Sequence, residues 1–113
     1  MIPMTDPVKE PWSVWIAQVK FSDDTDVKKR PVVVLKDNAV ACICMEVTSQ
    51  RKRYRHRYKI KNTKFAKLDK ESWVKFEQIE IDSDKFCYMV GMLDVEDVIG
   101  LKRWMTSRYN RFD

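Results

Sequence analysis

Glycine and histidine are scarce in this sequence. Only Gly91 and Gly100 occur among 113 residues, which excludes a glycine-rich phosphate-binding loop. His56 is the single histidine, so a nuclease that uses two histidines as base and acid is also excluded. With one histidine, no Ser-His-Asp or Cys-His arrangement is convincing. A surface position is the default interpretation of His56, and a catalytic role is the alternative.

Cysteine is also sparse, and it does not occur in metal-binding spacing. Cys42, Cys44 and Cys87 form no CxxC pair, so we expect small buried residues in a reducing compartment rather than a zinc site. The acidic loop SDDTD, residues 22–26, lacks the glycine and the distal glutamate of a calcium loop. We therefore expect no metal and no cofactor.

Long apolar runs are missing as well. No stretch approaches the roughly 20 residues of a membrane helix, and residues 1–11 carry prolines and acids where a secretion signal would need an apolar core. These absences predict a cytoplasmic protein that does not enter the membrane.

The chain length fits one domain over 1–113, with 1–11 as an irregular N-terminal arm and 12–113 as the folded part. Runs rich in β-branched and aromatic residues predict strands, and 63–70 suggests one helical turn. The fold class we expect is mainly β: a small, strongly bent barrel of five to seven short strands with a C-terminal α-helix. The expected strands are 12–21, 31–36, 39–47, 72–82 (one bent strand or two) and 85–91.

The C-terminal segment predicts the helix. Asp94 can serve as its N-cap, with Asp97 three residues further on. Apolar residues then follow at helical spacing, and basic residues gather toward the C-terminal end, as the helix dipole favours. The apolar positions are Val95, Val98, Ile99, Leu101, Trp104 and Met105.

Arg30 stands at the junction between the acidic loop and the apolar run PVVVL. We expect Pro31 to be the first residue of a strand, where proline is tolerated. A guanidinium held there can clamp a phosphate, because it is always charged and offers five donors in a rigid fork. It can equally pair with Asp23, Asp24 or Asp26.

Thr48 and Ser49 end the neighbouring apolar strand, in the run EVTSQ. Their hydroxyl groups can donate to a phosphate oxygen, or they can cap a turn.

Basic residues crowd the segment QRKRYRHRYKIK, 50–61, which holds seven Lys or Arg and no acid. Arginines alternate with aromatic rings there, a combination that neutralises a phosphate backbone and stacks unpaired bases. The segment therefore predicts a nucleic-acid contact that includes Arg51, Arg53 and Arg55. A solvated loop that keeps the protein soluble is the alternative.

These motifs follow one another in an order that resembles the PemK/MazF family of toxin endoribonucleases. The order is VWIAQVKF, a charged loop, KRPVVVL, a strand ending VTSQ, SWVKFEQIEID, and YMVGMLDVEDV leading into a helix. The resemblance covers about residues 12–105.

The resemblance implies an SH3-like barrel of the CcdB/MazF/Kid type, usually a homodimer, that cleaves single-stranded RNA at short sequences without metal. The products implied are a 2′,3′-cyclic phosphate and a 5′-hydroxyl. It assigns Arg30 and Thr48 as the catalytic pair and adds Ser49 and Gln78 as RNA-binding residues. A cognate antitoxin is the implied protein partner.

One position departs from the family pattern. Some members carry a catalytic arginine where this chain has Glu80, although Asp82 does match. The general base is not identified by the resemblance; Glu46 and the loop aspartates are candidates. Glu80 keeps open the alternative of a non-catalytic module that binds RNA or a protein target, as CcdB toxins do. An inert structural domain is a third interpretation.

Overall fold

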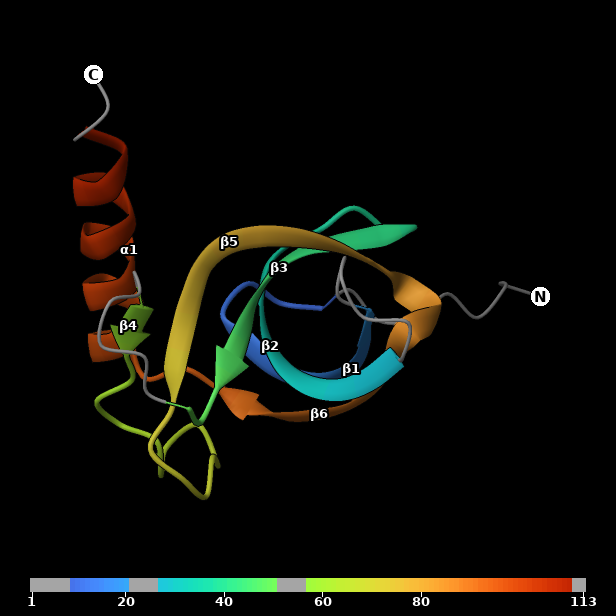
Figure 1. Ribbon diagram of the computed structural model, residues 1–113, viewed down its shortest axis with the longest axis horizontal. Helices are drawn as coiled ribbons and strands as arrows, with labels where there is room; N and C mark the ends of the chain where they lie inside the picture. Colours follow the sequence, from blue (N-terminus) through green and yellow to red (C-terminus); the bar gives the residue numbers. More distant parts are fainter. Residues whose placement is uncertain (1–8, 21–26, 51–56, 111–113) are drawn as a thin grey trace.

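The computed structural model describes residues 9–20, 27–50 and 57–110. Six strands, one short 3₁₀ helix and one α-helix follow one another in the described residues, as predicted for a mainly β chain (Figure 1). They are β1 Ser13–Lys20, β2 Val27–Asp37, β3 Ala41–Thr48, β4 Arg57–Lys59, β5 Trp73–Asp82, η1 Ser83–Lys85, β6 Phe86–Met92 and α1 Val95–Asn110.

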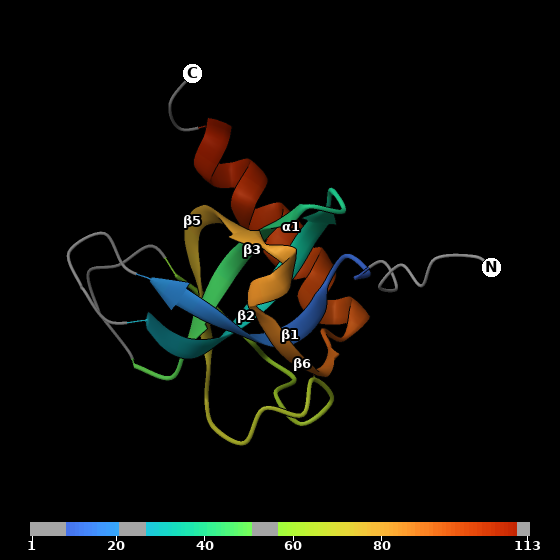
Figure 2. The ribbon, with the colours of Figure 1, turned by 90° about the vertical axis from the view of Figure 1, so that its right-hand side faces the viewer.

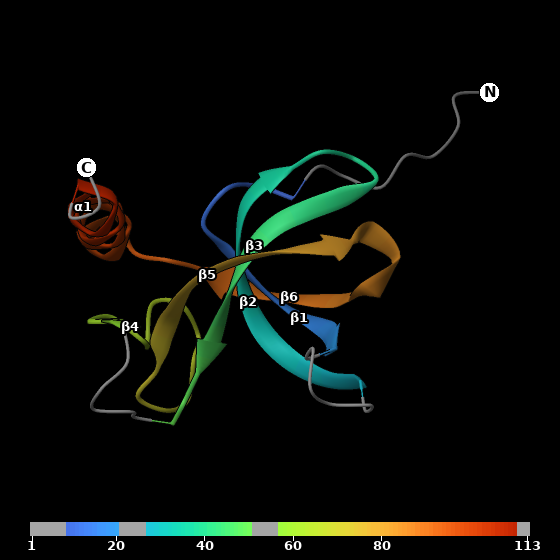
Figure 3. The same ribbon diagram turned by 45° about the horizontal axis from the view of Figure 1, so that its top comes forward.

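All six strands belong to one antiparallel sheet with the order β4-β5-β3-β2-β1-β6. The sheet bends until β1, β2, β3 and β5 follow a ring in Figure 1, while α1 and β4 lie outside it, as Figure 3 also shows. Strands β4 and β6 are its two edges among the described residues, so the barrel is open between them. Figure 2 shows η1 at the turn from β5 to β6.

Most predicted strands are confirmed, with one informative error. Strand β2 begins at Val27, so Arg30 and Pro31 lie inside it rather than at its start. The proline is tolerated because, among the described residues, β3 pairs with β2 only from Val32 onward and the earlier part of β2 is paired with β1 alone. Residues 72–82 form one strand, β5, and the segment 63–70 forms turns instead of a helical turn.

A tight turn at Asp37 and Asn38 connects β2 to β3. The Asp37 carboxylate accepts a hydrogen bond from the Ala39 N–H at 2.8 Å, which stabilises the positive φ of 74° at Ala39. Its other oxygen accepts from the Lys9 N–H at 2.7 Å, which ties down the segment that leads into β1, four residues before its start. These contacts, that of Lys9 first, hold the pKa of Asp37 below its usual value.

Side chains that alternate along the strands build two apolar clusters, one on each face of the sheet. The helix-side cluster contains Val33, Met45, Val47 and Val74 from the sheet and Leu101 from α1. The cavity-side cluster faces the other way. Its buried members are Ala17, Val19, Val32, Val34, Cys42, Cys44 and Ile81.

Cysteine burial follows this division in part. Cys42 and Cys44 lie two apart on one face of β3 and are fully buried in the cavity-side cluster, as expected. Cys87 on the edge strand β6 is exposed, so the expectation that all three are buried is wrong there. An edge strand with no second neighbour leaves one flank open to solvent.

Helix α1 is anchored by Asp97, whose side chain is fully buried. Its carboxylate accepts hydrogen bonds from the Tyr58 hydroxyl at 2.9 Å, the Lys61 N–H at 2.8 Å and the Asn62 N–H at 2.9 Å. Asp97 therefore joins the helix to β4 and to the loop that follows β4. The sequence had suggested a local role for Asp97 at the N-terminal cap of the helix. Of the predicted apolar stripe, Val95 and Ile99 point to solvent instead of the core.

Both glycines lie where another chain segment comes too close for a side chain. A Cβ at Gly91 would be 2.7 Å from the Ala66 carbonyl oxygen, and one at Gly100 would overlap the Tyr58 hydroxyl. Gly91, Leu93 and Asp97 form a G-x-L-x-x-x-D motif within the run YMVGMLDVEDV, and both Leu93 and Asp97 are buried. The motif is therefore structural: it packs β6, the loop after β4 and the start of α1 together.

Candidate functional site

Strand pairing brings Arg30 into line with Thr48. The last paired residues of β2 and β3 are Val32 and Glu46, and continuing that register by two residues sets Arg30 opposite Thr48. Side chains two apart on a strand share a face, so Arg30, Glu46 and Thr48 all belong to the face of the cavity-side cluster. The two residues that the family resemblance singles out therefore converge on one face at the same end of the sheet.

Arg30 is partly enclosed by the sheet, up to the first nitrogen of its guanidinium group. It is paired with the buried Ala17 of β1, and its Nε atom is itself buried. The residue as a whole is half-buried. A guanidinium fixed in this way gives up little conformational freedom when it meets a phosphate.

The hydroxyl group of Thr48 caps a turn, which was one of the two roles considered for it beside binding a phosphate oxygen. Its Oγ1 accepts a hydrogen bond from the Gln50 N–H at 3.1 Å. A hydroxyl that accepts one bond still has its own proton to donate, so the cap orients the hydroxyl group and leaves it able to bind a phosphate oxygen. The two interpretations are therefore compatible.

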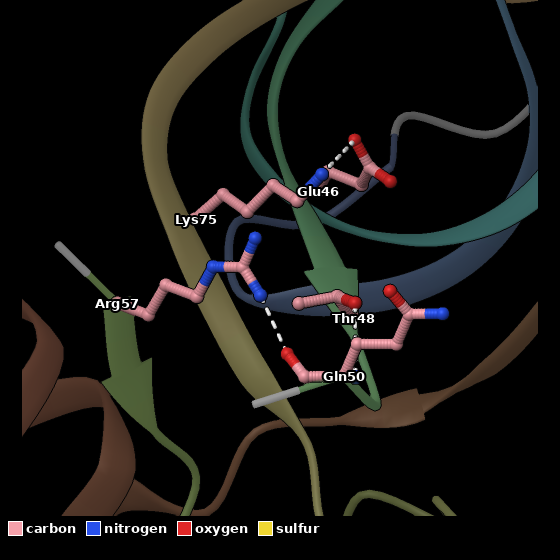
Figure 4. A network of polar contacts seen from close by, with 5 residues as sticks. All are labelled: Glu46, Thr48, Gln50, Arg57 and Lys75. Atoms are coloured by element: carbon pink, nitrogen blue, oxygen red, sulfur yellow. Dashed lines mark hydrogen bonds and ion pairs between the residues drawn. The ribbon is translucent and has the colours of Figure 1, made fainter. Parts of the chain in front are cut away.

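Arg57 lies at the same place, and it belongs to the basic segment for which the sequence predicts a nucleic-acid contact. Its Nη1 donates to the Gln50 carbonyl oxygen at 2.5 Å, two residues beyond Thr48 (Figure 4). This contact fixes the two ends of the basic segment beside the end of β3. It adds a half-buried positive charge next to the Thr48 hydroxyl.

Glu46 and Lys75 form an ion pair at the inner side of the site. The Glu46 carboxylate is 3.3 Å from Lys75 Nζ, and the Glu46 side chain is 8% exposed against 31% for Lys75 (Figure 4). Lys75 gave no signal in the sequence, because an isolated lysine in an alternating strand is typical of a solvated face. Lys75 precedes Ile79 and Ile81 on β5 by even numbers of residues, so strand alternation places it on their face, the cavity-side face.

A cavity of about 630 Å³ adjoins the pair. It lies where β1 ends and β2 begins, and β5 forms one wall. Its apolar surface comes from Val19, Ile79 and Ile81, while its polar surface includes Glu46, Lys75 and Glu77. The cavity and Arg30 thus share one face of the sheet.

The other predicted site residues are distributed differently. Ser49 is exposed directly after β3, next to Thr48. Gln78 is exposed and pairs with Met45 of the helix-side cluster, so it lies on the face opposite to Arg30 and Thr48. Glu80, at the position of the family arginine, is exposed and belongs to the lining of the cavity.

Several predicted positions lie outside the described residues. They are Arg51, Arg53, Arg55 and His56 of the basic segment, and Asp23, Asp24 and Asp26 of the acidic loop. In the described part of the chain, no three His, Cys, Asp or Glu residues are grouped so that they could hold a metal ion. Helix α1 is not long and apolar enough to span a membrane.

Comparison with known families assigns the chain. Residues 10–106 match the family described as PemK-like, MazF-like toxin of type II toxin-antitoxin system. The chain belongs to this family. Membership confirms the resemblance noted in the sequence, and a PemK-like toxin of a type II system has an antitoxin as its partner. No curated protein matches this PemK-like chain.

Two solved structures show the same fold as this PemK-like toxin. The Mycobacterium tuberculosis toxin MazF-mt6 superposes with a TM-score of 0.68 at 15% sequence identity, covering 87% of this chain and 96% of that one. MazF from Deinococcus radiodurans, in its crystal Form-I, also has a TM-score of 0.68, at 17% identity, covering 93% and 99%. At such low identity the likeness extends to the fold alone.

Proposed function

We propose that this PemK-like toxin is a sequence-specific endoribonuclease that cuts single-stranded RNA without a metal ion. The observation that carries the proposal is the common face and register of Arg30 and Thr48, at the open end of a barrel whose family consists of toxins. The reaction would act in the cytoplasm, where RNA is accessible.

In the proposed reaction the ribose 2′-hydroxyl gives up its proton to a general base, and its oxygen forms a bond to phosphorus. The bond from phosphorus to the 5′-oxygen breaks, and that oxygen takes up a proton from solvent. The products are a 2′,3′-cyclic phosphate and a 5′-hydroxyl. Negative charge develops on the phosphorane oxygens, where the preorganised Arg30 guanidinium stabilises it. Thr48 is oriented by its turn cap, and its hydroxyl group donates a hydrogen bond to a phosphate oxygen.

RNA binding extends the proposal beyond the two catalytic residues. Arg51, Arg53 and Arg55 would neutralise backbone phosphates on either side of the cut, and Ser49 would add a hydrogen bond. Arg57, which is fixed to the Gln50 carbonyl, joins this set on the strength of its position. Gln78 stays a proposed RNA contact on the other face of the sheet, one that a homodimer can bring into use by extending the binding surface across two copies.

The test is cleavage of a long RNA in the presence of a chelator. Wild-type protein should release discrete fragments with 5′-hydroxyl ends, while Arg30→Ala should lose at least about a thousandfold in rate and remain folded. The matched control is Lys29→Ala, which removes the same charge from the next residue of β2, on the opposite face. It should cut within a few fold of wild type.

Two outcomes would contradict the proposal. RNA that is retarded on a gel but remains intact would favour the non-catalytic binding module that Glu80 keeps open. Full activity of Arg30→Ala, or an equal loss in Lys29→Ala, would remove Arg30 from the catalytic step and leave only its charge.

A further inference from the structure

The cavity beside the proposed catalytic pair has the form of a nucleobase pocket. Its walls include the apolar side chains of Val19, Ile79 and Ile81, and charged side chains from β1, β3, β5 and η1 complete the lining. At about 630 Å³ it has room for a planar base with several of its neighbouring groups. Flat apolar walls with a few polar groups at the edge are what an unpaired base requires of a protein.

Position links the cavity to the reaction. Glu46 lines the cavity and lies two residues before Thr48 on the same face of β3. Two residues along a strand span about 7 Å. A phosphate held between Arg30 and Thr48 would therefore place the base of an adjoining nucleotide at the mouth of the cavity.

Charge decides which base fits. Glu46 is more than nine-tenths buried and its carboxylate is paired with Lys75, so it meets a ligand as a charged hydrogen-bond acceptor. Three further carboxylates line the cavity and outnumber, together with Glu46, the three lysines there; the carboxylates are Glu77, Glu80 and Asp82, and the lysines are Lys20, Lys75 and Lys85. Carboxylates accept hydrogen bonds but cannot donate them. They suit the amino groups of cytosine, adenine and guanine, and they repel the O4 carbonyl oxygen that uracil presents instead.

We propose that this cavity binds one base of the RNA substrate next to the cut, and that Glu46 selects a base with an exocyclic amino group over uracil. Lys75 positions the Glu46 carboxylate through their 3.3 Å contact. This inference rests on the proposed function for its place beside the scissile phosphate. It goes further in naming a specificity-determining residue and the class of base that it accepts.

The test compares wild type with Glu46→Gln on an RNA pool that is randomised around the cut. Mapping the 5′-hydroxyl ends of wild-type products should show uracil depleted about tenfold or more at one position. The glutamine amide can donate to O4 as well as accept, so Glu46→Gln should admit uracil at that position. The matched control is Glu71→Gln, which removes the same charge from an exposed residue just before β5. It should keep the wild-type pattern.

A ligand-side experiment covers the case in which Glu46→Gln does not fold. Substrates in which the preferred base lacks its amino group, through purine riboside, pyrimidin-2-one or inosine, should be cut about tenfold more slowly by the wild type. Equal rates for the natural and altered bases would overturn the proposal.

Other results separate the pocket from the catalysis. Cleavage with no discrimination against uracil, or an unchanged cleavage pattern in Glu46→Gln, overturns the proposal of a base pocket but not the proposal of a nuclease. If Glu46→Gln cuts every sequence more slowly by the same factor, Glu46 acts as the general base, and the proposal of a base pocket is also overturned. If wild type does not cut at all, the nuclease proposal fails, and the pocket is tested by binding: oligo(C) or oligo(A) should bind about tenfold tighter than oligo(U), and Glu46→Gln should abolish the difference.

Discussion

The two faces of the sheet are buried by the same alternating strands but are closed in different ways. On the helix-side face, α1 and the loop after β4 cover the apolar side chains, and the buried carboxylate of Asp97 joins the covering segments. On the cavity-side face, the apolar cluster gives way to a cavity bordered by the Glu46–Lys75 ion pair. The chain thus uses one buried carboxylate, Asp97, to join its segments, while the other, Glu46, lines a cavity.

The largest change should come from removing the carboxylate of the closed face. Asp97→Ala would leave the Tyr58 hydroxyl and the N–H groups of Lys61 and Asn62 without their acceptor in a buried site. We expect a loss of about 3–5 kcal/mol in the free energy of unfolding, measured by urea denaturation. Glu96→Ala, one residue earlier and exposed, is the control and should change stability by under about 0.5 kcal/mol. Equal effects of the two changes would show that Asp97 does not anchor the helix.

A smaller loss is expected where α1 meets β4. An alanine in a helix is ordinarily more stable than a glycine by about 1 kcal/mol. Gly100→Ala should reverse that sign and destabilise the protein by about 1–2 kcal/mol, because the new methyl group would overlap the Tyr58 hydroxyl.

Denaturation of Ser107→Ala, at an exposed position of the same helix, supplies the reference value. If Gly100→Ala were as stable as this control or more stable, the close approach of α1 and β4 would be refuted.

The sequence predicted the mainly β class, five strands and the helix because these depend on local composition and periodicity. The start of β2 was misplaced because proline beside charged residues indicates a strand boundary. Only the structure shows that, among the described residues, β3 pairs with β2 from Val32 onward, which makes room for Pro31 inside the strand. The sequence also assigned Asp97 a local capping role, because its partners lie 35 to 39 residues away and no local pattern connects them.

The site was predictable only where the family order of motifs pointed to it. Arg30 and Thr48 were found in this way, and the register brings them into line. Lys75 was missed as a site residue because its partner Glu46 lies 29 residues away in the sequence, and the basic segment predicted a phosphate contact for its arginines but not the contact of Arg57 with the Gln50 carbonyl. Charge spacing along the chain carries no information on such contacts.

The smallest expected effect is a difference in alkylation between the cysteines of the cavity-side face and the cysteine on the sheet edge. Burial raises the pKa of the Cys42 thiol to about 11 and that of the Cys44 thiol to about 12, so both are neutral and unreactive at pH 8. Cys87 is exposed. Mass spectrometry after brief alkylation of the native protein at pH 8 should find Cys87 alone modified, and all three cysteines after denaturation in urea. Rapid native labelling of Cys42 or Cys44 would show that the cavity-side face opens.

The most direct test of the catalytic assignment is a double-mutant cycle on RNA cleavage with Arg30→Ala, Thr48→Val and the two combined. If both side chains act on one phosphate, the double variant should be hardly slower than the slower single variant, and Thr48→Ser should recover activity by restoring the hydroxyl. Rate losses that multiply in the double variant, or a Thr48→Val protein as active as wild type, would contradict a joint action of Arg30 and Thr48.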